Sequence, residues 1–227
     1  MRFLDRADAG RFLAEQLGHF ANRGDVIVLA LPRGGVPVGY EVARALHAPL
    51  EVFVVRKLGV PGQRELAMGA IASGGTRVLN PDVLAALGED ARQAIEETTA
   101  REMEELALAE KQYRAAREFP DLHGKTIILV DDGLATGATM RAAARAVRQL
   151  QPRSVVVAVP VAAESSCREL RREADAVICG FMPAEFFGVG QFYDNFRQTT
   201  DEEVRELLRQ AAENTSKDSP NEPAASS

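Results

Sequence analysis

Five short apolar runs, most of them rich in β-branched residues, constrain the fold of this chain more than any other feature. These runs are Val26–Leu31, Glu51–Val55, Thr126–Val130, Ser154–Val159 and Ala176–Cys179. Their length and composition are typical of strands buried on both faces, which occur in parallel sheets covered by helices. Segments with helical periodicity lie between or beside the runs: Arg2–Phe20, Val36–Leu46, Thr139–Leu150, Glu164–Glu173 and Asp201–Ala212. The alternation predicts an α/β fold with a doubly wound, mostly parallel sheet and right-handed crossovers.

The composition is that of a soluble globular protein. The chain has 227 residues, of which 46% are hydrophobic and 26% charged, and its formal net charge is −6. Such a chain can bury a sizeable core, and its acidic balance argues against a role in coating nucleic acids. No apolar run approaches the roughly 20 residues that span a bilayer, and the charged start Met1–Asp8 is not typical of a signal peptide. We therefore expect a cytoplasmic protein with neither nucleic acid nor membrane partners.

The two cysteines, Cys167 and Cys179, are too few and too badly spaced for a disulfide framework or a zinc site. With three histidines and no Cys-x-x-Cys pair, the chain offers no structural metal site. A reduced protein is the expectation.

Two regions interrupt the alternation of strands and helices. The glycine-rich stretch Lys57–Asn80 predicts a hairpin, with Ala67–Ala72 and Thr76–Leu79 as its strands. The stretch Pro81–Phe119 is charged and mostly helical, with one narrow apolar stripe. The stripe consists of Ile95, Thr99, Met103, Leu106, Ala109 and Tyr113. We interpret it as a surface helix that packs on the core, with a subunit contact as the alternative.

These patterns predict one folded domain over residues 1–213. Its core would span 24–180 and contain an inserted region at 57–119, and a small hood would follow at 181–200. Residues 214–227 are rich in Ser, Pro, Asn and Ala without an apolar pattern, and we expect them to form a disordered tail.

The segment Ile127–Met140 carries the clearest chemistry. Its apolar strand ends in two adjacent carboxylates, Asp131 and Asp132, and a loop rich in Gly and Thr leads to a helix near Thr139. Free N–H groups at a helix start form an anion site that suits a monophosphate. The two carboxylates can accept hydrogen bonds from a vicinal diol such as that of ribose. The alternative is a strand–turn–helix with two solvated Asp residues.

This segment resembles the phosphoribosyl pyrophosphate signature of type I phosphoribosyltransferases, in its adenine-type form. The resemblance implies that the phosphate is bound by Ala135, Thr136, Gly137, Ala138 and Thr139. Some purine enzymes of the family carry an Asp, proposed as a proton acceptor, where this chain has Ala135. That role is therefore in doubt for this protein, whereas ligand binding is not affected.

Two upstream elements fit the same resemblance. Arg33, Gly34 and Gly35 match the family's pyrophosphate loop, which often contains one unusual peptide bond, although a tight turn would use the same residues. Arg56 and Lys57 end the next predicted strand, where relatives have a basic pair that leads into a mobile loop over the diphosphate.

In this loop Gly59 and Gly62 would act as hinges, and Arg64 and Glu65 would move with it. Ordinary surface charge is the alternative for the basic pair.

The segment Pro183–Phe196 resembles the hood of the hypoxanthine–guanine branch. The alignment places Phe187 on the aromatic residue that stacks on the base and Asp194 on an acid of the metal shell. We expect the other aromatic residues of the segment to be core: Phe186, Phe192, Tyr193 and Phe196. This chain lacks the Lys that reads the purine oxygen and has Pro160–Ala163 there, so we assign no purine.

The resemblance as a whole is to bacterial phosphoribosyltransferase-like proteins of unsettled acceptor. It implies a glycosyltransferase of nucleotide metabolism that uses phosphoribosyl pyrophosphate and Mg²⁺ and transfers ribose 5-phosphate to a nitrogen heterocycle. Asp131, Asp132 and Lys57 would be catalytic, and Asp132 and Asp194 would reach the metal mostly through ligand and water. A sensor that binds phosphoribosyl pyrophosphate or a nucleotide without catalysis is the alternative, and a homodimer is compatible with either interpretation.

Overall fold

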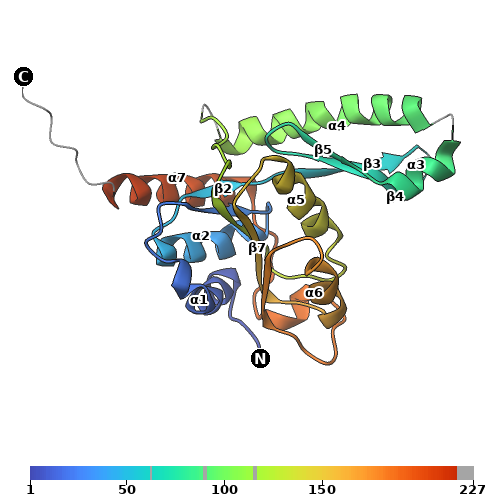
Figure 1. Ribbon diagram of the computed structural model, residues 1–227. Coiled ribbons are helices and arrows are strands. Elements are labelled where there is room, and N and C mark those ends of the chain that lie inside the picture. Colours follow the sequence, from blue (N-terminus) through green and yellow to red (C-terminus); the bar gives the residue numbers. More distant parts are fainter. Residues whose placement is uncertain (62, 89–90, 115–116, 219–227) are drawn as a thin grey trace, which may run out of the picture.

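The computed structural model describes residues 1–61, 63–88, 91–114 and 117–218, and its centre is a five-stranded sheet (Figure 1). Across the sheet the strand order is β2, β1, β6, β7, β8, and all neighbours are parallel. The strands are β1 (Val26–Ala30), β2 (Leu50–Val52), β6 (Thr126–Val130), β7 (Ser154–Val161) and β8 (Ala176–Phe181). The predicted α/β fold with a mostly parallel sheet is confirmed.

Helices cover both faces of this sheet because successive strand residues point to opposite sides. Val26, Val28 and Ala30 of β1 join a core cluster with α1 (Arg6–Gln16), α2 (Gly35–Leu46) and α7 (Asp201–Asp218). Ile27 and Leu29 join a second cluster with α5 (Ala138–Gln149) and α6 (Glu164–Leu170). The strand interiors are therefore shielded from water on both sides, as their unbroken apolar runs require.

A second, antiparallel sheet forms an arm beside the central sheet (Figure 1). It consists of β3 (Val55–Val60), β4 (Gln63–Ala72) and β5 (Thr76–Leu79), and it packs against α3 (Pro81–Leu87) and α4 (Ala91–Arg114). The predicted hairpin is confirmed. Along the α4 stripe, Leu106 is buried in the arm's own core, whereas Met103 is 54% exposed.

The predicted strand Glu51–Val55 is wrong at its end, because the chain changes sheets there. β2 stops at Val52, and the N–H of Val54 donates to Ser73 Oγ at 3.0 Å while the N–H of Ser73 donates to the Val54 carbonyl. Ser73 is fully buried. This exchange of hydrogen bonds starts the second sheet at Val55.

The N-terminal segment pairs with the hood, which shortens the first helix. Phe3 bridges to Tyr193, and both side chains are buried in a small core of their own. The predicted helix from Arg2 therefore begins only at Arg6, capped by Asp5, and its last turn is the short 3₁₀ helix η1 (Gly18–Phe20). A second 3₁₀ helix, η3 (Val189–Phe192), lies in the hood.

A disulfide joins Cys167 of α6 to Cys179 of β8. The prediction of a reduced protein is therefore wrong for these two residues. The chain turns between α6 and β8, which brings the cysteines to a Cα–Cα distance of 6.8 Å across a sequence separation of 12. Spacing along the chain did not reveal this proximity.

The C-terminal helix is longer than its sequence pattern suggested. α7 continues to Asp218, so residues 214–218 of the predicted tail are helical, and residues 219–227 lie outside the described part. Within that part, none of the helices is both long enough and apolar enough to cross a bilayer.

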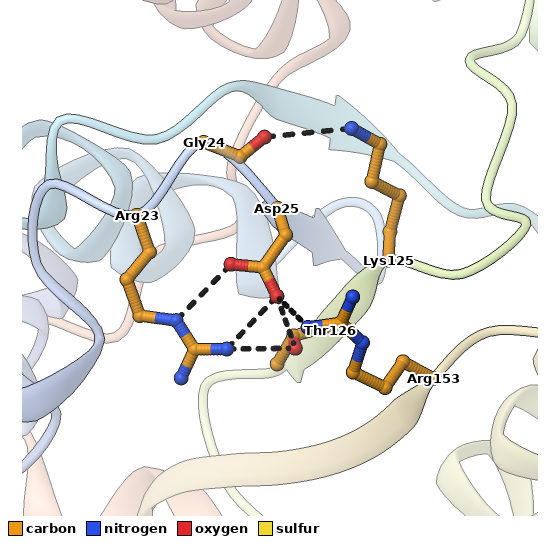
Figure 2. Close-up of polar contacts among 6 residues, drawn as sticks. All are labelled: Arg23, Gly24, Asp25, Lys125, Thr126 and Arg153. Carbon is orange, nitrogen blue, oxygen red and sulfur yellow. Dashed lines mark hydrogen bonds and ion pairs between the residues drawn. The ribbon is translucent and has the colours of Figure 1, made fainter.

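A cluster of polar side chains connects the N-terminal ends of the three central strands (Figure 2). Asp25 receives hydrogen bonds from Arg23 at 2.9 and 3.1 Å, from Thr126 at 3.1 Å and from Arg153 at 3.3 Å. Lys125 donates to the Gly24 carbonyl at 3.4 Å. These residues precede or begin β1, β6 and β7, so the opposite ends of the same strands are left to form the ligand site.

Candidate active site

Two loops meet where β1 and β6 end. The peptide bond between Pro32 and Arg33 is cis, which matches the unusual bond that the family resemblance implies. A Cβ atom on Gly34 would lie 2.8 Å from Asp132 Cγ, and one on Gly35 would lie 2.7 Å from the Val130 carbonyl oxygen. Only glycine permits this approach. The structure therefore brings the predicted pyrophosphate loop and the predicted acidic pair into direct contact.

The two carboxylates differ in their surroundings. Asp131 Oδ1 accepts a hydrogen bond of 2.8 Å from the N–H of Asp132. Burial, followed by the charge of Asp132, raises the pKa of Asp131 well above its ordinary value. Burial also raises the pKa of Asp132, but the Arg6 guanidinium opposes that rise. The two carboxylates lie close together, and Arg6 is the cation that pairs with Asp132. The negative charge that remains on the pair can be compensated by the hydroxyl donors of a ligand or by a bound cation.

Arg6 is the main site residue that sequence reasoning missed. Its Nε lies 2.8 Å from Asp132 Oδ2, although the two residues are 126 positions apart. Tyr193 Oη also donates to the carbonyl of Asp132, at 2.6 Å. No motif or spacing marks Arg6, because its position follows only from the pairing of the N-terminal segment with the hood.

The predicted phosphate loop runs from the acidic pair to the start of α5. Gly137 has φ +67°, a left-handed conformation that favours glycine, and it stands at the N-cap position of α5. The N–H of Ala138 lies 3.5 Å from Thr136 Oγ1. Two residues that the sequence did not single out donate hydrogen bonds to the backbone of this loop. Ser166 Oγ donates to the Ala135 carbonyl, and Arg141 Nη1 donates to the Thr136 carbonyl at 2.8 Å.

Arg33 and Arg56 of the site are already paired with acidic residues. Arg33 Nη1 lies 3.7 Å from Asp201, which also accepts a 2.6 Å hydrogen bond from Tyr113 of α4. Arg56 Nε lies 3.1 Å from Glu102 of α4. Arg56 and Lys57 do not end a strand as predicted; they lie within β3, because the arm sheet begins at Val55. Lys57 is exposed.

A cavity of about 460 Å³ joins these elements. Its polar lining includes Arg6, Arg33, Arg56, Tyr113, Asp132 and Thr139. The cavity thus brings together side chains from β3, α4, both predicted ligand loops and the N-terminal helix. Its polar, mixed-charge wall suits a small phosphorylated molecule.

The sequence profile of the family described as "Phosphoribosyl transferase domain" matches residues 3–190. The chain belongs to this family. The cis loop, the acidic pair and the Gly137 turn lie inside the matched region.

Two curated relatives from Mycobacterium tuberculosis, of strains CDC 1551 / Oshkosh and ATCC 25618 / H37Rv, carry the provisional name phosphoribosyl transferase. Each is 47% identical over 209 residues, which make up 92% of this chain and 47% of the relative. The chain spans about half the length of the curated relatives it matches.

A solved structure matches nearly end to end. The crystal structure of TT1426 from Thermus thermophilus is 43% identical in sequence and superposes with a TM-score of 0.82. The match covers 92% of this chain and 99% of that one. The arm and the hood thus lie within a fold that an experimentally solved relative shares along almost its whole length.

The predicted lid of this phosphoribosyltransferase-family chain is the tip of the β3–β4 hairpin. Gly59 lies in β3, and the strand register shifts on both sides of it. Gly62 and the side chains of Arg64 and Glu65 lie outside the described residues. Closure of this tip stays a prediction.

In the hood, the aromatic ring predicted to stack on a base points into solvent. Phe187 is 89% exposed, and its N–H donates to Gln191 Oε1 at 3.1 Å. Val189, rather than Phe187, lies against the signature loop, since a Cβ on Gly133 would lie 2.6 Å from Val189 Cγ1.

The remaining hood residues divide between surface and core. Asp194 forms an exposed ion pair of 2.9 Å with Arg2, so the structure does not bring it to the acidic pair. Phe192 and Tyr193 are buried, as expected of core residues, whereas Phe196 is 37% exposed.

The carboxylates of the acidic pair suit Mg²⁺ only together with oxygens of a bound ligand and of water. Within the described ranges, no three His, Cys, Asp or Glu side chains group so that they could hold a metal ion. Mg²⁺ is commonly bound by one or two carboxylates together with substrate phosphates and waters. Asp132, which lines the cavity of about 460 Å³, and its neighbour Asp131 supply such carboxylates.

Proposed function

We propose that this protein transfers ribose 5-phosphate from phosphoribosyl pyrophosphate to a nitrogen heterocycle and releases pyrophosphate. The observation that carries the proposal is the close approach of Gly34 and Asp132, which line the same cavity. It joins an anion-binding loop to a diol-binding carboxylate, and a sugar diphosphate is the ligand that needs both groups side by side.

Different residues of the chain bind the different parts of the ligand. N–H groups from Thr136 to Thr139, at the positive end of the α5 dipole, hold the 5-phosphate. Asp131 and Asp132 accept hydrogen bonds from the ribose hydroxyls and favour the positive charge that develops on the sugar as the bond to pyrophosphate breaks.

The diphosphate is held by the Arg33–Gly35 loop together with Arg56 and Lys57. Arg33 and Arg56 have carboxylate partners in the free protein, at 3.7 and 3.1 Å. Ligand binding therefore exchanges Asp201 and Glu102 for phosphate oxygens. Glu102 belongs to α4, which packs on the arm, and Asp201 belongs to α7, which contacts α4. This exchange would therefore also change how the arm is held.

Asp131 and Asp132 would hold Mg²⁺ mainly through the ligand and water, and Asp194 would reach it only after leaving Arg2. When bound, the ion neutralises charge on the diphosphate leaving group. We further propose a cytoplasmic location, a role in nucleotide metabolism and a homodimer, with neither nucleic acid nor membrane as partner.

The test is incubation of the protein with phosphoribosyl pyrophosphate, Mg²⁺ and a panel of nitrogen bases, with pyrophosphate release as the readout. Release that depends on one base supports the transferase and names the acceptor. Tight binding of phosphoribosyl pyrophosphate without release for any base would instead support the sensor. Absence of binding would contradict both.

A further inference from the structure

Arg6 contacts Asp132 of the acidic pair, although it belongs to none of the motifs that the sequence analysis identified. Its Nε lies 2.8 Å from Asp132 Oδ2, and the two side chains are only 11% and 14% exposed. An ion pair this well shielded is not weakened by solvent in the way that exposed pairs are. Its position beside the ligand cavity therefore calls for an explanation other than surface charge.

Two further contacts, besides the one between Nε and Asp132, fix the plane of the Arg6 guanidinium. Nη1 donates to the Arg197 carbonyl at 2.7 Å, and the guanidinium carbon lies 4.1 Å from the centre of the Phe196 ring. The Phe196 ring packs on Tyr193, whose hydroxyl donates to the Asp132 carbonyl. Asp132 is thus held at its carboxylate and at its backbone by one connected group of side chains.

Pairing between the chain's N-terminal segment and the hood delivers Arg6 to this place. The N–H of Phe3 donates to the Phe192 carbonyl, and the N–H groups of Asp194 and Asn195 donate back to Phe3 and Leu4, all at 2.8–2.9 Å. The helix that starts with Arg6 follows directly. A charged residue is therefore placed at the site by backbone hydrogen bonds that are independent of the two ligand loops.

The remaining donor group of Arg6 is free for a ligand. Among the described residues, Nη2 has no protein partner, and Arg6 lines the same cavity as Arg33 and Thr139. A Cβ on Gly34 would lie 3.3 Å from Arg6 Nε, so the guanidinium also borders the pyrophosphate loop. Arg6 is therefore a cation that borders both the acidic pair and the pyrophosphate loop, with one nitrogen that its contacts with the described residues do not use.

We propose that Arg6 is a substrate-site residue: Nε orients Asp132 toward the ribose, and Nη2 donates hydrogen bonds to charged oxygens of phosphoribosyl pyrophosphate. This role rests on the proposed function. Arg6 would add a third cation to Arg33 and Arg56, which line the same cavity. Its planar fork of N–H donors matches the geometry of carboxylate and phosphate oxygens, whereas a lysine acts as a flexible point charge.

The test is calorimetric titration of the protein with phosphoribosyl pyrophosphate and Mg²⁺. Arg6→Gln should weaken binding roughly 10- to 100-fold, the effect of losing hydrogen bonds to charged groups. Arg6→Lys keeps the charge and should recover part of the loss. Arg11→Gln is the matched control, since Arg11 lies on the same helix and pairs only with Asp8 and Glu41 among the described residues. It should bind as wild type does.

A double-mutant cycle tests the action through Asp132. In an Asp132→Asn background, Arg6→Gln should weaken binding several-fold less than in the wild type, because the Asp132 half of its role is already lost. Equal losses in both backgrounds would overturn the proposal, as would wild-type affinity in a folded Arg6→Gln protein. If Arg6→Gln does not fold, the same criteria apply to Arg6→Lys.

Failure of this inference can be told apart from failure of the proposed function. A wild-type protein that binds the ligand while the Arg6 variants bind equally well removes only the role of Arg6. A wild-type protein that does not bind phosphoribosyl pyrophosphate at all removes the proposed function, and the role of Arg6 with it.

Discussion

Gly34 and Asp132 lie so close that no side chain fits between them. A Cβ on Gly34 would be 2.8 Å from Asp132 Cγ and closer still to Oδ2. We therefore expect Gly34→Ala to push the acidic pair away from the pyrophosphate loop and to weaken phosphoribosyl pyrophosphate binding at least tenfold, measured by calorimetry. Gly18→Ala is the control, because a Cβ there meets nothing within 4 Å. Equal affinities in the two variants would show that the loops can separate without cost.

The acidic pair should matter for the ligand more than for the fold. Asp131→Asn and Asp132→Asn should each remain folded and lose about 1.5–3 kcal/mol of binding or transition-state energy. Their stabilities should differ: Asp131→Asn relieves a repulsion, whereas Asp132→Asn also weakens the pair with Arg6. Ligand with Mg²⁺ should raise the Tm of the wild type far more than that of either variant. Equal thermal protection of all three proteins would contradict the site assignment.

The pH dependence of stability should reveal Asp131. Burial and the neighbouring charge raise its pKa in the folded protein, so the folded state binds this proton more tightly than the unfolded state does. Its contribution to stability is therefore fully present below the ordinary carboxyl pKa and is lost as pH rises through the raised value.

Without ligand, the stability of the wild type relative to Asp131→Asn should accordingly increase as pH falls from neutral toward the ordinary carboxyl range. Denaturant melts of both proteins across that range measure the difference. A difference that does not change with pH would mean that Asp131 is not perturbed in solution.

Asp25 should show the opposite dependence at the other end of the sheet. Hydrogen bonds from Arg23, and then from Thr126, lower its pKa to about 2 (Figure 2). Its stabilising contribution is present above the ordinary carboxyl pKa and is lost as pH falls toward 2. Asp25→Asn should therefore lower the Tm near neutral pH, and the gap to wild type should narrow in acid and at high salt. A gap that is constant in both titrations would indicate a packing effect instead.

Phe187 offers a test of the acceptor side. If this exposed ring stacks on the base once the ligand is bound, Phe187→Ala should weaken the acceptor by about 1–3 kcal/mol and leave phosphoribosyl pyrophosphate affinity unchanged. Phe186 packs on Phe192 within the hood core, so Phe186→Ala should lower the Tm as well. Unchanged acceptor kinetics in Phe187→Ala would leave Val189, which touches the signature loop, as the better candidate.

Local sequence determined the strands and the ligand loops. The apolar runs at Thr126–Val130 and Ser154–Val159 predicted buried parallel strands because only strands covered on both faces need unbroken apolar side chains. The Asp131–Asp132 pair and the Arg33–Gly35 turn were readable because each chemical requirement lies within a few consecutive residues, and the fold brings both to one sheet edge.

Tertiary structure decided what depends on residues far apart in the chain. Arg6 meets Asp132 across 126 positions, and Cys167 meets Cys179 only because the chain turns back between α6 and β8. The strand predicted from Glu51 likewise ends early because Val54 forms its hydrogen bonds with Ser73, which leads into the second sheet. Sequence periodicity reports which face of an element is buried, but it carries no information about which distant group a polar atom will meet. For that reason the sequence predicted the ligand loops, whereas the cation that holds Asp132 in place had to be found in the folded structure.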